Sequence, residues 1–584
     1  MGYTGTVLRI DLSTGKATKE PLNKEWAMDY LGGKGLSIKY LYEELKPGTD
    51  PLSPDNKLIL MTGPTTGTIV PNSGKLAVAA KSPATGTILD CSIGGHFAPE
   101  LKYAGYDAVI IEGKAKMPVY LYIEDDLVEM RSAAGLWGKG AHETEHLLAE
   151  ELDDVITLAI GQAGENLLSM ACISSELYRQ AGRGGIGAVM GSKNLKAISV
   201  WGSGGLEMPN IRKFSAAMNK IKQEDTMTDD NMWAYTDGTP MIVELSNSTG
   251  ILPTRNFQTG TFDEYKNIDS EAVKGVLKAK KACFACPLAC SNYVKKGKTE
   301  VEGPEYETLA LCGSNCGIGN LEAVIEFNRQ CDDYCLDTIS AGNVVAFAME
   351  LTEKGIHDFG IRFGDVDNFL KMPGLIAKRE GVGADLALGV KAMAAKFGGS
   401  DFAMEIKGLE IPGYDPRGSW AQGLAYATAD RGACHMRAWP TAVEAFGDVD
   451  PFTSEGKARL VIDLQDDNAV KYSAIFCDFW ALSTERMAEI LSLLLERELT
   501  AADLTRIGER VYNLARLFNE REGFKKDDDY LPARIHNEKL TTGVTEGKLL
   551  PREDYQKMLS DYYQLRGWDE NGMITETKKK ELNL

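Results

Sequence analysis

Three cysteines in one short loop constrain the fold of this chain more than any other feature of its sequence. Cys283, Cys286 and Cys290 have the spacing C-x2-C-x3-C within "KACFACPLACSNYV". Thiolates this close together suit the corners of a cube-shaped iron–sulfur cluster, which takes its fourth thiolate from elsewhere in the chain. The fold therefore has to bring a distant cysteine to this loop, and we expect the protein to transfer electrons one at a time.

Cys477 is the expected fourth ligand, because it lies in the apolar and aromatic run "KYSAIFCDFW" that would keep water away from a cluster. A structural zinc site is an alternative, but such sites usually take four ligands as two pairs. No second cysteine pair lies near the motif. A radical-SAM site is a further alternative, but its order, C-x3-C-x2-C, is the reverse of the order found here.

Composition narrows the class of protein and its compartment. The 584 residues carry a net charge of -20, which argues against nucleic acid, since phosphate binding needs a basic surface. No run approaches the roughly 20 apolar residues of a membrane span, and the N-terminus has no apolar signal core. The eleven cysteines are therefore not expected to form disulfides, and the expected cluster implies a reducing cytoplasm.

Hydrophobic periodicity predicts an α+β fold. Residues 1–208 contain many short β-branched runs bounded by turn residues, interrupted by helical stretches at 95–104 and 139–151. From there on, apolar residues recur with the helical period of 3.6, and the cysteine motif is expected between helices. We predict a two-sheet β domain at 1–208, a helical domain with three cluster cysteines at 209–410, and a helical domain with the fourth at 411–584.

Two glycine pairs in the β domain suit anion binding. Arg183 precedes Gly184 and Gly185 in "AGRGGIGAVMGSKNLKA", where backbone N–H groups can approach a phosphate and arginine adds a forked donor. Gly94 and Gly95 run into a predicted helix in "SIGGHFAPELK". The first segment lacks the Gly-Lys-Ser/Thr of a Walker loop and opens no clean βαβ unit. Taken alone, either pair could be an ordinary tight turn.

One acidic segment and one histidine are candidate catalytic features. Glu305-Tyr306-Glu307 opens a predicted apolar helix in "EVEGPEYETLA", and His435 lies among Cys, Met, Arg and Trp in "RGACHMRAWP". A carboxyl group in an apolar site can have its pKa raised and serve as an acid or a base. The alternatives are a solvated acidic face for the first segment and a hydrogen-bonded core histidine for the second.

Together these segments resemble the tungsten-containing aldehyde:ferredoxin oxidoreductase family along nearly the whole chain. The segments that carry the resemblance include "GYTGTVLRIDL", "LGGKGLSIKYL", "KSPATG", "GGHFAPELKYAGYDAVIIEGKA", "AGRGGIGAVMGSKNLKAI", "CFACPLAC", "EGPEYE", "YDPRG" and "RGACHMRAW". The resemblance implies a tungsten held by two pyranopterins without a protein ligand, one [4Fe–4S] cluster, and Mg2+ bridging the pterin phosphates. It also implies that aldehydes are oxidised to carboxylic acids, and that a two-sheet saddle binds the cofactor.

The resemblance assigns roles residue by residue. Cys283, Cys286, Cys290 and Cys477 match the cluster ligands, and Glu307 and His435 match the acid and histidine near the tungsten. The remaining matches are to pterin-binding or phosphate-binding positions: Lys75, Ser92, Gly94, Gly95, Arg183, Gly184, Gly185, Asp332, Leu336 and Asp337.

Several of these positions depart from the family pattern. In the first pterin motif, D-x-x-G-L-D, Cys335 replaces Gly, and in the second, D-x-x-G-L-C, Tyr472 replaces Asp and Ile475 replaces Gly. Lys75 stands where Arg is common, and Ser92 where Asn is usual. These changes put the pterin contacts in question, above all around the second motif.

A further departure bears on assembly. Some homodimeric relatives hold a bridging iron through E-x-x-H, and here that motif reads Glu326-Phe327-Asn328-Arg329. Arginine stays protonated and is no ordinary metal ligand, so we predict that the bridging-iron homodimer is absent. The expected electron acceptor is ferredoxin or a dedicated iron–sulfur subunit, and the acidity of the chain predicts a local basic patch or a permanent interface for it.

Two rival functions follow from the same sequence. One is a low-potential reductase of another substrate, such as an aromatic thioester, although no coenzyme A site is evident. The other is an electron-transfer subunit without tungsten, which the altered second pterin motif keeps open. The sequence does not separate tungsten from molybdenum.

Overall fold

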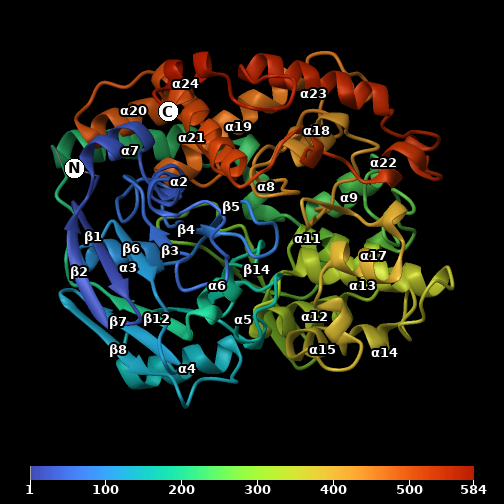
Figure 1. The fold of residues 1–584 in the computed structure, drawn as a ribbon, viewed down its shortest axis with the longest axis horizontal. Coiled ribbons are helices and arrows are strands. Elements are labelled where there is room, and N and C mark those ends of the chain that lie inside the picture. The colour runs from blue at the N-terminus through green and yellow to red at the C-terminus, as the bar shows by residue number, and fades with distance from the viewer. Residues whose placement is uncertain (1, 209) are drawn as a thin grey trace.

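The computed structural model describes residues 2–208 and 210–584 and confirms the predicted α+β class. The blue-to-cyan N-terminal part in Figure 1 contains two six-stranded sheets, and helices make up most of the rest. Residues 1 and 209 lie outside the described residues, and they are the predicted first residues of the first and second domains. The predicted division at 410 stays a prediction. No helix in the described part of the chain is long and apolar enough to cross a membrane.

The first sheet has the strand order β2-β1-β6-β3-β4-β5, and the second has the order β11-β10-β9-β12-β7-β8. Strands of the first sheet are β1 (Thr6–Asp11), β2 (Lys16–Pro21), β3 (Leu58–Met61), β4 (Leu76–Lys81), β5 (Ile88–Ile93) and β6 (Ala108–Glu112). Strands of the second are β7 (Val119–Glu124), β8 (Leu127–Ser132), β9 (Ile156–Ala159), β10 (Ile173–Ser175), β11 (Arg179–Ala181) and β12 (Leu195–Trp201).

Strands β3 and β4 of the first sheet are buried on both faces. Because successive side chains of a strand point to opposite faces, Leu60 and Val78 pack toward the second sheet. Their neighbours Ile59 and Ala77 pack into a separate core formed with helices. This double burial explains why β3 and β4 are continuous apolar runs, and it fixes the sheet between the helical layer and the second sheet.

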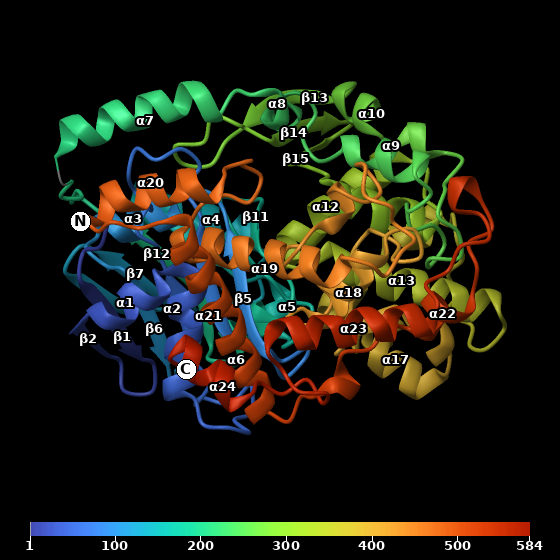
Figure 2. The ribbon, with the colours of Figure 1, turned by 90° about the horizontal axis from the view of Figure 1, so that it is seen from above.

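Both helices predicted within the β domain are confirmed, as α3 (Phe97–Tyr103) and α4 (Ala141–Leu152). Four other helices of this region were not predicted: α1 (Lys24–Tyr30), α2 (Gly33–Glu44), α5 (Gln162–Glu165) and α6 (Ile186–Ser192). Most of α2 is buried, including its polar Lys34 and Ser37, so its sequence shows no apolar stripe. In Figure 2, α2 lies beside the orange C-terminal helices α19 and α21.

Four helices form the framework around the candidate site: α12 (Leu321–Tyr334), α13 (Thr338–Glu353), α19 (Lys457–Ala474) and α21 (Ala501–Arg521). Helix α21 begins with a capping box, in which Thr500 accepts from the Asp503 N–H and Asp503 accepts from the Thr500 N–H. Helices α12 and α19 end close to the site, and their last turns carry both pterin-like motifs.

The expectation that the cysteine motif lies between helices was wrong. The motif joins β13 (Leu277–Lys281) to β14 (Ser291–Lys296), and β15 (Thr299–Glu302) completes an antiparallel sheet of three strands. Strand β13 is mostly exposed and rich in lysine, so it lacks the apolar alternation by which strands are recognised.

Candidate active site and cysteine loop

The structure brings the two candidate catalytic residues together. Glu307 belongs to the short helix α11 (Tyr306–Thr308), and His435 lies in the loop after α18 (Trp420–Thr428). His435 Nδ1 is 3.5 Å from Glu307 Oε1. The second carboxylate oxygen accepts a hydrogen bond of 2.8 Å from the Gly413 N–H. Glu307 Oε1 and His435 Nδ1 are buried and have no hydrogen-bond partner among residues 2–208 and 210–584, so both can bind a ligand.

The surroundings keep this pair uncharged at neutral pH. Burial raises the pKa of Glu307 to about 8, although the Gly413 N–H opposes the shift. Burial lowers the pKa of His435 to about 3, and the positive charges of Arg183 and Arg431 add to the effect. Near neutral pH, the pair can therefore offer both a proton donor and a proton acceptor to a bound molecule.

Arg183 connects the β domain to both helical regions. Its Nε donates to Asp337 Oδ2 at 3.1 Å, and its Nη1 donates to the Ala433 carbonyl at 2.6 Å. The following Gly184 and Gly185 have φ angles of 72° and 81°, which side chains rarely adopt. The glycine pair leads directly into α6 (Ile186–Ser192), so the predicted glycine–arginine segment is a strand-to-helix turn beside the candidate site.

The segment 332–337 reverses the chain between α12 and α13. Asp332 accepts from Gln180 Nε2 at 3.1 Å, and Asp337 caps α13 by accepting from the Ile339 N–H at 3.1 Å. Leu336 is buried and forms an isolated β-bridge with Ala171 of the β domain. All three predicted residues therefore hold the end of α12 against the β domain and Arg183.

The second glycine pair lies against the cysteine loop. Ser92 is near the end of β5, and the glycines lead into α3 as predicted. A Cβ atom on Gly94 would lie 2.7 Å from Cys283 Sγ, so a larger residue would displace the loop. Gly95 has a φ of 104°, and a Cβ there would collide with the Glu176 carboxylate.

The four predicted cluster cysteines are reduced and partly buried. Burial raises the pKa of Cys290 well above the ordinary value, and the charges of Glu305 and of the other three cysteines raise it further. Within residues 2–208 and 210–584, no three His, Cys, Asp or Glu side chains converge around a single-ion site. A cube-shaped cluster does not need such convergence, because each thiolate binds a different iron.

Lys75 lies next to the fourth cysteine. Its Nζ forms an ion pair with the Asp478 carboxylate and is 5.7 Å from the ring centre of Tyr472. The lysine therefore contributes its positive charge between the end of α19 and strand β4.

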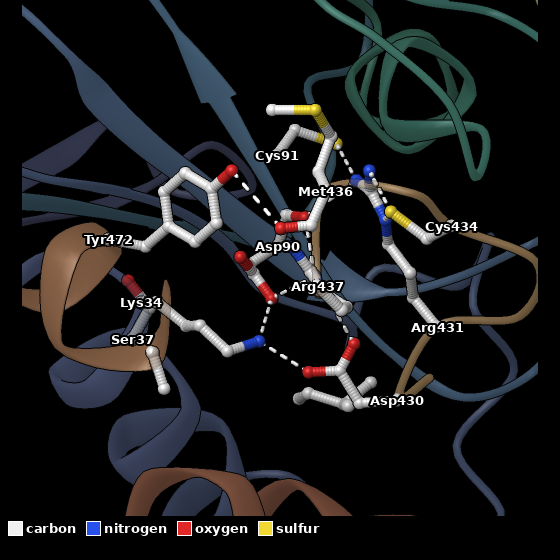
Figure 3. A network of polar contacts seen from close by, with 12 residues as sticks. Lys34, Ser37, Asp90, Cys91, Asp430, Arg431, Cys434, Met436, Arg437 and Tyr472 are labelled. Atoms are coloured by element: carbon white, nitrogen blue, oxygen red, sulfur yellow. Dashed lines mark hydrogen bonds and ion pairs between the residues drawn. The ribbon is translucent and has the colours of Figure 1, made fainter. Parts of the chain in front are cut away.

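A buried ionic network that the sequence did not predict lies close by (Figure 3). Lys34 donates to Asp90 Oδ1 at 2.7 Å and also pairs with Asp430, whose other oxygen accepts from Arg437 Nε at 2.7 Å. All four side chains are at most 4% exposed. The pair Lys34–Asp430 spans 396 positions of the sequence, so no local motif could have revealed it.

Arg431 links this network to the active-site loop. It donates to the Asp90 carbonyl at 2.9 Å and to Cys434 Sγ at 3.0 Å. Burial opposes ionisation of Cys434, but Arg431 and Arg437 outweigh it and hold the pKa of this thiol below the ordinary value. Two guanidinium nitrogens of Arg431 therefore hold Cys434, the residue before His435.

The family of the chain follows from comparison with known proteins. A family model described as "Aldehyde ferredoxin oxidoreductase, N-terminal domain" matches residues 7–202, and one described as "Aldehyde ferredoxin oxidoreductase, domains 2 & 3" matches 214–584. The chain belongs to the aldehyde ferredoxin oxidoreductase family. It is therefore an oxidoreductase, and the resemblance inferred from the motifs is confirmed.

Individual aldehyde ferredoxin oxidoreductases match over the full chain. Proteins named tungsten-containing aldehyde ferredoxin oxidoreductase from Pyrococcus horikoshii and Thermococcus kodakarensis are 42% and 40% identical, covering 100% of this chain and 99% of theirs. A WOR-like subunit of aliphatic sulfonate oxidoreductase from Pyrococcus furiosus is 32% identical, covering 100% and 97%. Among solved structures, the active-site complex BamBC of benzoyl coenzyme A reductase with 1,5-dienoyl-CoA has a TM-score of 0.86 at 25% identity, covering 100% and 97%.

In this family member, Glu326 and Arg329 of the altered E-x-x-H motif form an ion pair with each other. Arg329 Nη2 is 2.7 Å from Glu326 Oε1, and Thr299 donates to the other oxygen of Glu326 at 2.7 Å. Both carboxylate oxygens therefore have partners within the chain. The absence of a bridging iron stays a prediction.

Proposed function

We propose that this protein oxidises an aldehyde to a carboxylate and passes the two electrons singly to ferredoxin. The overall reaction is RCHO + H2O + 2 oxidised ferredoxin → RCOO⁻ + 3 H⁺ + 2 reduced ferredoxin. The buried pair Glu307–His435, with an unpartnered oxygen and an unpartnered nitrogen, carries the proposal. The full-length similarity to enzymes named for this reaction supports it.

We propose a tungsten bis-pyranopterin, one [4Fe–4S] cluster and a Mg2+ ion between the pterin phosphates as cofactors. Cys283, Cys286, Cys290 and Cys477 would hold the cluster. The residues proposed to hold the pterins and their phosphates are Lys75, Ser92, Gly94, Gly95, Arg183, Gly184, Gly185, Asp332, Leu336 and Asp337. When bound, the tungsten accepts two electrons and the cluster releases them one at a time.

The donor set of the described residues fits these groups. Arg183 is buried and precedes two glycines, whose lack of side chains would let a phosphate approach their N–H groups. Gly94 leaves room for Cys283 Sγ, and Lys75 places a cation next to Cys477. Glu307 Oε1 and His435 Nδ1 supply free polar atoms where a substrate would bind.

His435 and Glu307 have separate roles in the proposed reaction. A neutral imidazole has one N–H, which His435 donates to the aldehyde oxygen, where it stabilises the negative charge that develops there. Glu307 accepts a proton from the attacking water in its ionised form, which is the minor form at pH 7 because its pKa is raised to about 8. The Gly413 N–H holds the far carboxylate oxygen, so that Oε1 is left to face the water.

The proposal is tested by an anaerobic assay against aliphatic and aromatic aldehydes, with metal content measured on the same sample. We expect aldehyde-dependent reduction of benzyl viologen, about one tungsten and about four irons per chain. Turnover with molybdenum in place of tungsten would correct the metal only. An iron-only protein without aldehyde turnover would support the electron-transfer subunit instead, and turnover of an aromatic thioester would support the low-potential reductase.

We further propose that the enzyme works in the cytoplasm without a bridging-iron homodimer. The pairing of Glu326 with Arg329 supports the second point, because both groups of the altered E-x-x-H motif are already engaged. Metal analysis that finds iron shared between two copies of the chain would overturn it.

A further inference from the structure

A lysine-rich sheet carries the cysteine loop at the protein surface. Residues 271–300 contain seven Lys and two Glu, whereas the whole chain has a net charge of -20. Lys278 and Lys281 on β13, Lys295 and Lys296 on β14, and Lys298 in the next turn are all exposed. This segment therefore forms a local positive region on an acidic protein.

Three of these lysines have no carboxylate partner in the part of the chain that the structure describes. Lys278 and Lys295 share Glu300, at 2.6 and 2.5 Å. Among the residues that the structure describes, no carboxylate lies within 4.0 Å of the ammonium groups of Lys281, Lys296 or Lys298. These three charges are free to attract an acidic partner.

The lysine-rich sheet is joined directly to the cysteine loop at both ends. Lys281 is two residues before Cys283, and it pairs in register with Ser291, which follows Cys290. The three loop cysteines are only half-buried, and Ala285 between them is exposed. Figure 2 shows β13–β15 at the upper edge of the molecule, between α8 and α10.

The size of the surface suits a small partner. At about 3.4 Å per residue, β14 extends about 17 Å from the cysteine loop to Lys296. Weak electron-transfer complexes have the smallest specific interfaces, below about 1,200 Å² in total. Exposed Leu277 and Tyr235 of the adjoining α8 (Asp229–Thr236) add apolar contact area. Asn292 Nδ2 donates to the Asp237 carbonyl at 2.8 Å and ties α8 to β14.

Protection of an exposed strand is the simpler explanation for these lysines, because charged residues on an edge strand prevent pairing with other chains. It accounts for Lys278 and Lys281, since β13 is an edge of its sheet. It does not account for Lys296 and Lys298, which end the central strand and begin the hairpin turn. The two explanations differ in what charge reversal does to partner binding.

We propose that the lysine-rich sheet β13–β15 is the docking surface for an acidic iron–sulfur carrier of the ferredoxin class. The proposal rests on the function proposed above. In each encounter, the reduced cluster loses one electron and the oxidised carrier gains it, with no proton or atom transferred. Two encounters therefore follow each aldehyde oxidised. Opposite charges hold the two proteins together briefly, so the complex depends on salt.

The test uses the complete holoenzyme and a purified acidic [4Fe–4S] ferredoxin. The variant K281E/K296E/K298E reverses the three unpaired charges. The matched control K114E/K116E/K391E reverses three exposed lysines elsewhere, two between β6 and β7 and one on α17 (Val390–Phe397). We expect the Kd for ferredoxin at 50 mM NaCl to rise about tenfold or more in the first variant and less than twofold in the control. At 500 mM NaCl, the difference should vanish, since salt screens surface charges.

Further measurements keep failure of docking apart from failure of the proposed function. Iron content and aldehyde-dependent viologen reduction should be unchanged in both variants. Wild-type ferredoxin binding by K281E/K296E/K298E, equal weakening in both variants, or a complex that persists in 1 M NaCl would overturn the docking surface. Lysine-dependent binding in an enzyme that does not oxidise aldehydes would support the docking surface and overturn only the proposed function.

Discussion

Helices α12 and α19 both end in a left-handed turn, but different side chains surround the two turns. Both helices stop at a left-handed residue that is not glycine, Cys335 with a φ of 57° and Ile475 with a φ of 68°. Such a conformation costs a residue with a side chain roughly 1–2 kcal/mol. Burial compensates, because Cys335 and Ile475 are 0% and 1% exposed. The left-handed turn is therefore kept where the family pattern has glycine.

The side chains around the two turns make different contacts. The end of α12 presents Asp337 to Arg183, beside the candidate catalytic pair. At the end of α19, the Tyr472 hydroxyl donates to the Met436 carbonyl at 3.2 Å, Lys75 pairs with Asp478, and Cys477 follows two residues after Ile475. We infer that the first end serves the chemistry and the second serves the exit of electrons. Changes at the two ends should therefore have separable effects.

The largest expected effect is at the electron-exit end. Cys477→Ser removes the proposed fourth cluster ligand, so aldehyde-dependent viologen reduction should fall by more than about 100-fold, which is the most that loss of a residue supporting a ligand usually costs. Iron per chain should fall with it. Cys335→Ser is the matched control at the other end and should keep its iron, because Cys335 is not a proposed ligand. Full iron content in Cys477→Ser would remove this residue from the cluster.

The next largest effect is at the chemical end. Glu307→Gln keeps an oxygen that can accept from the Gly413 N–H but removes the proton acceptor, so kcat should fall by about 10²–10⁴-fold. Tungsten and iron content should stay at the wild-type level, unlike in Cys477→Ser. A Glu307→Gln enzyme with wild-type turnover would rule out the assigned role.

The pH dependence sharpens the same assignment. A base must be ionised, and the pKa of Glu307 is raised to about 8, so its active form increases with pH. We expect kcat/KM to rise about tenfold from pH 6 to 7 and to level off above pH 8. His435 adds no second change in kcat/KM over this pH range, since its pKa of about 3 leaves it neutral throughout. Activity that declines above pH 8 would instead make Glu307 a proton donor.

The smallest effects concern the turns themselves. Replacement by glycine relieves about 1–2 kcal/mol of backbone strain at either turn. Loss of a buried isoleucine side chain costs more, about 2–5 kcal/mol even when alanine replaces it. Ile475→Gly should therefore destabilise the protein by about 1–3 kcal/mol. Cys335→Gly should be closer to neutral, because cysteine is smaller. Urea denaturation of the two apoproteins measures the difference, and an equal loss would show that packing does not hold the turns.

Local features of the site were predictable, and long-range contacts were not. The cluster motif, the glycine turns and the acid at Glu307 can each be recognised within a few residues. The approach of Glu307 to His435 joins α11 to a loop over 100 residues away, and only the packing of the helical regions creates it. The same holds for Lys34 and Asp430, which meet across the layers.

The errors in the predicted fold have physical causes. Helix α2 was missed because its polar residues are buried together with its apolar ones. Strand β13 was missed because lysines occupy both of its faces, so the cysteine loop was placed between helices. The same lysines form the proposed docking surface, so the strand that pattern recognition overlooked carries a proposed function.

The central claim is that electrons from the aldehyde leave through the cluster at the end of α19. Its most direct test is an electron paramagnetic resonance spectrum of the anaerobic holoenzyme, recorded before and after addition of an aldehyde that it turns over. We predict that the signal of a reduced [4Fe–4S] cluster appears in the wild type and is absent in Cys477→Ser. Aldehyde oxidation that leaves the wild-type cluster oxidised, without an added acceptor, would contradict the account.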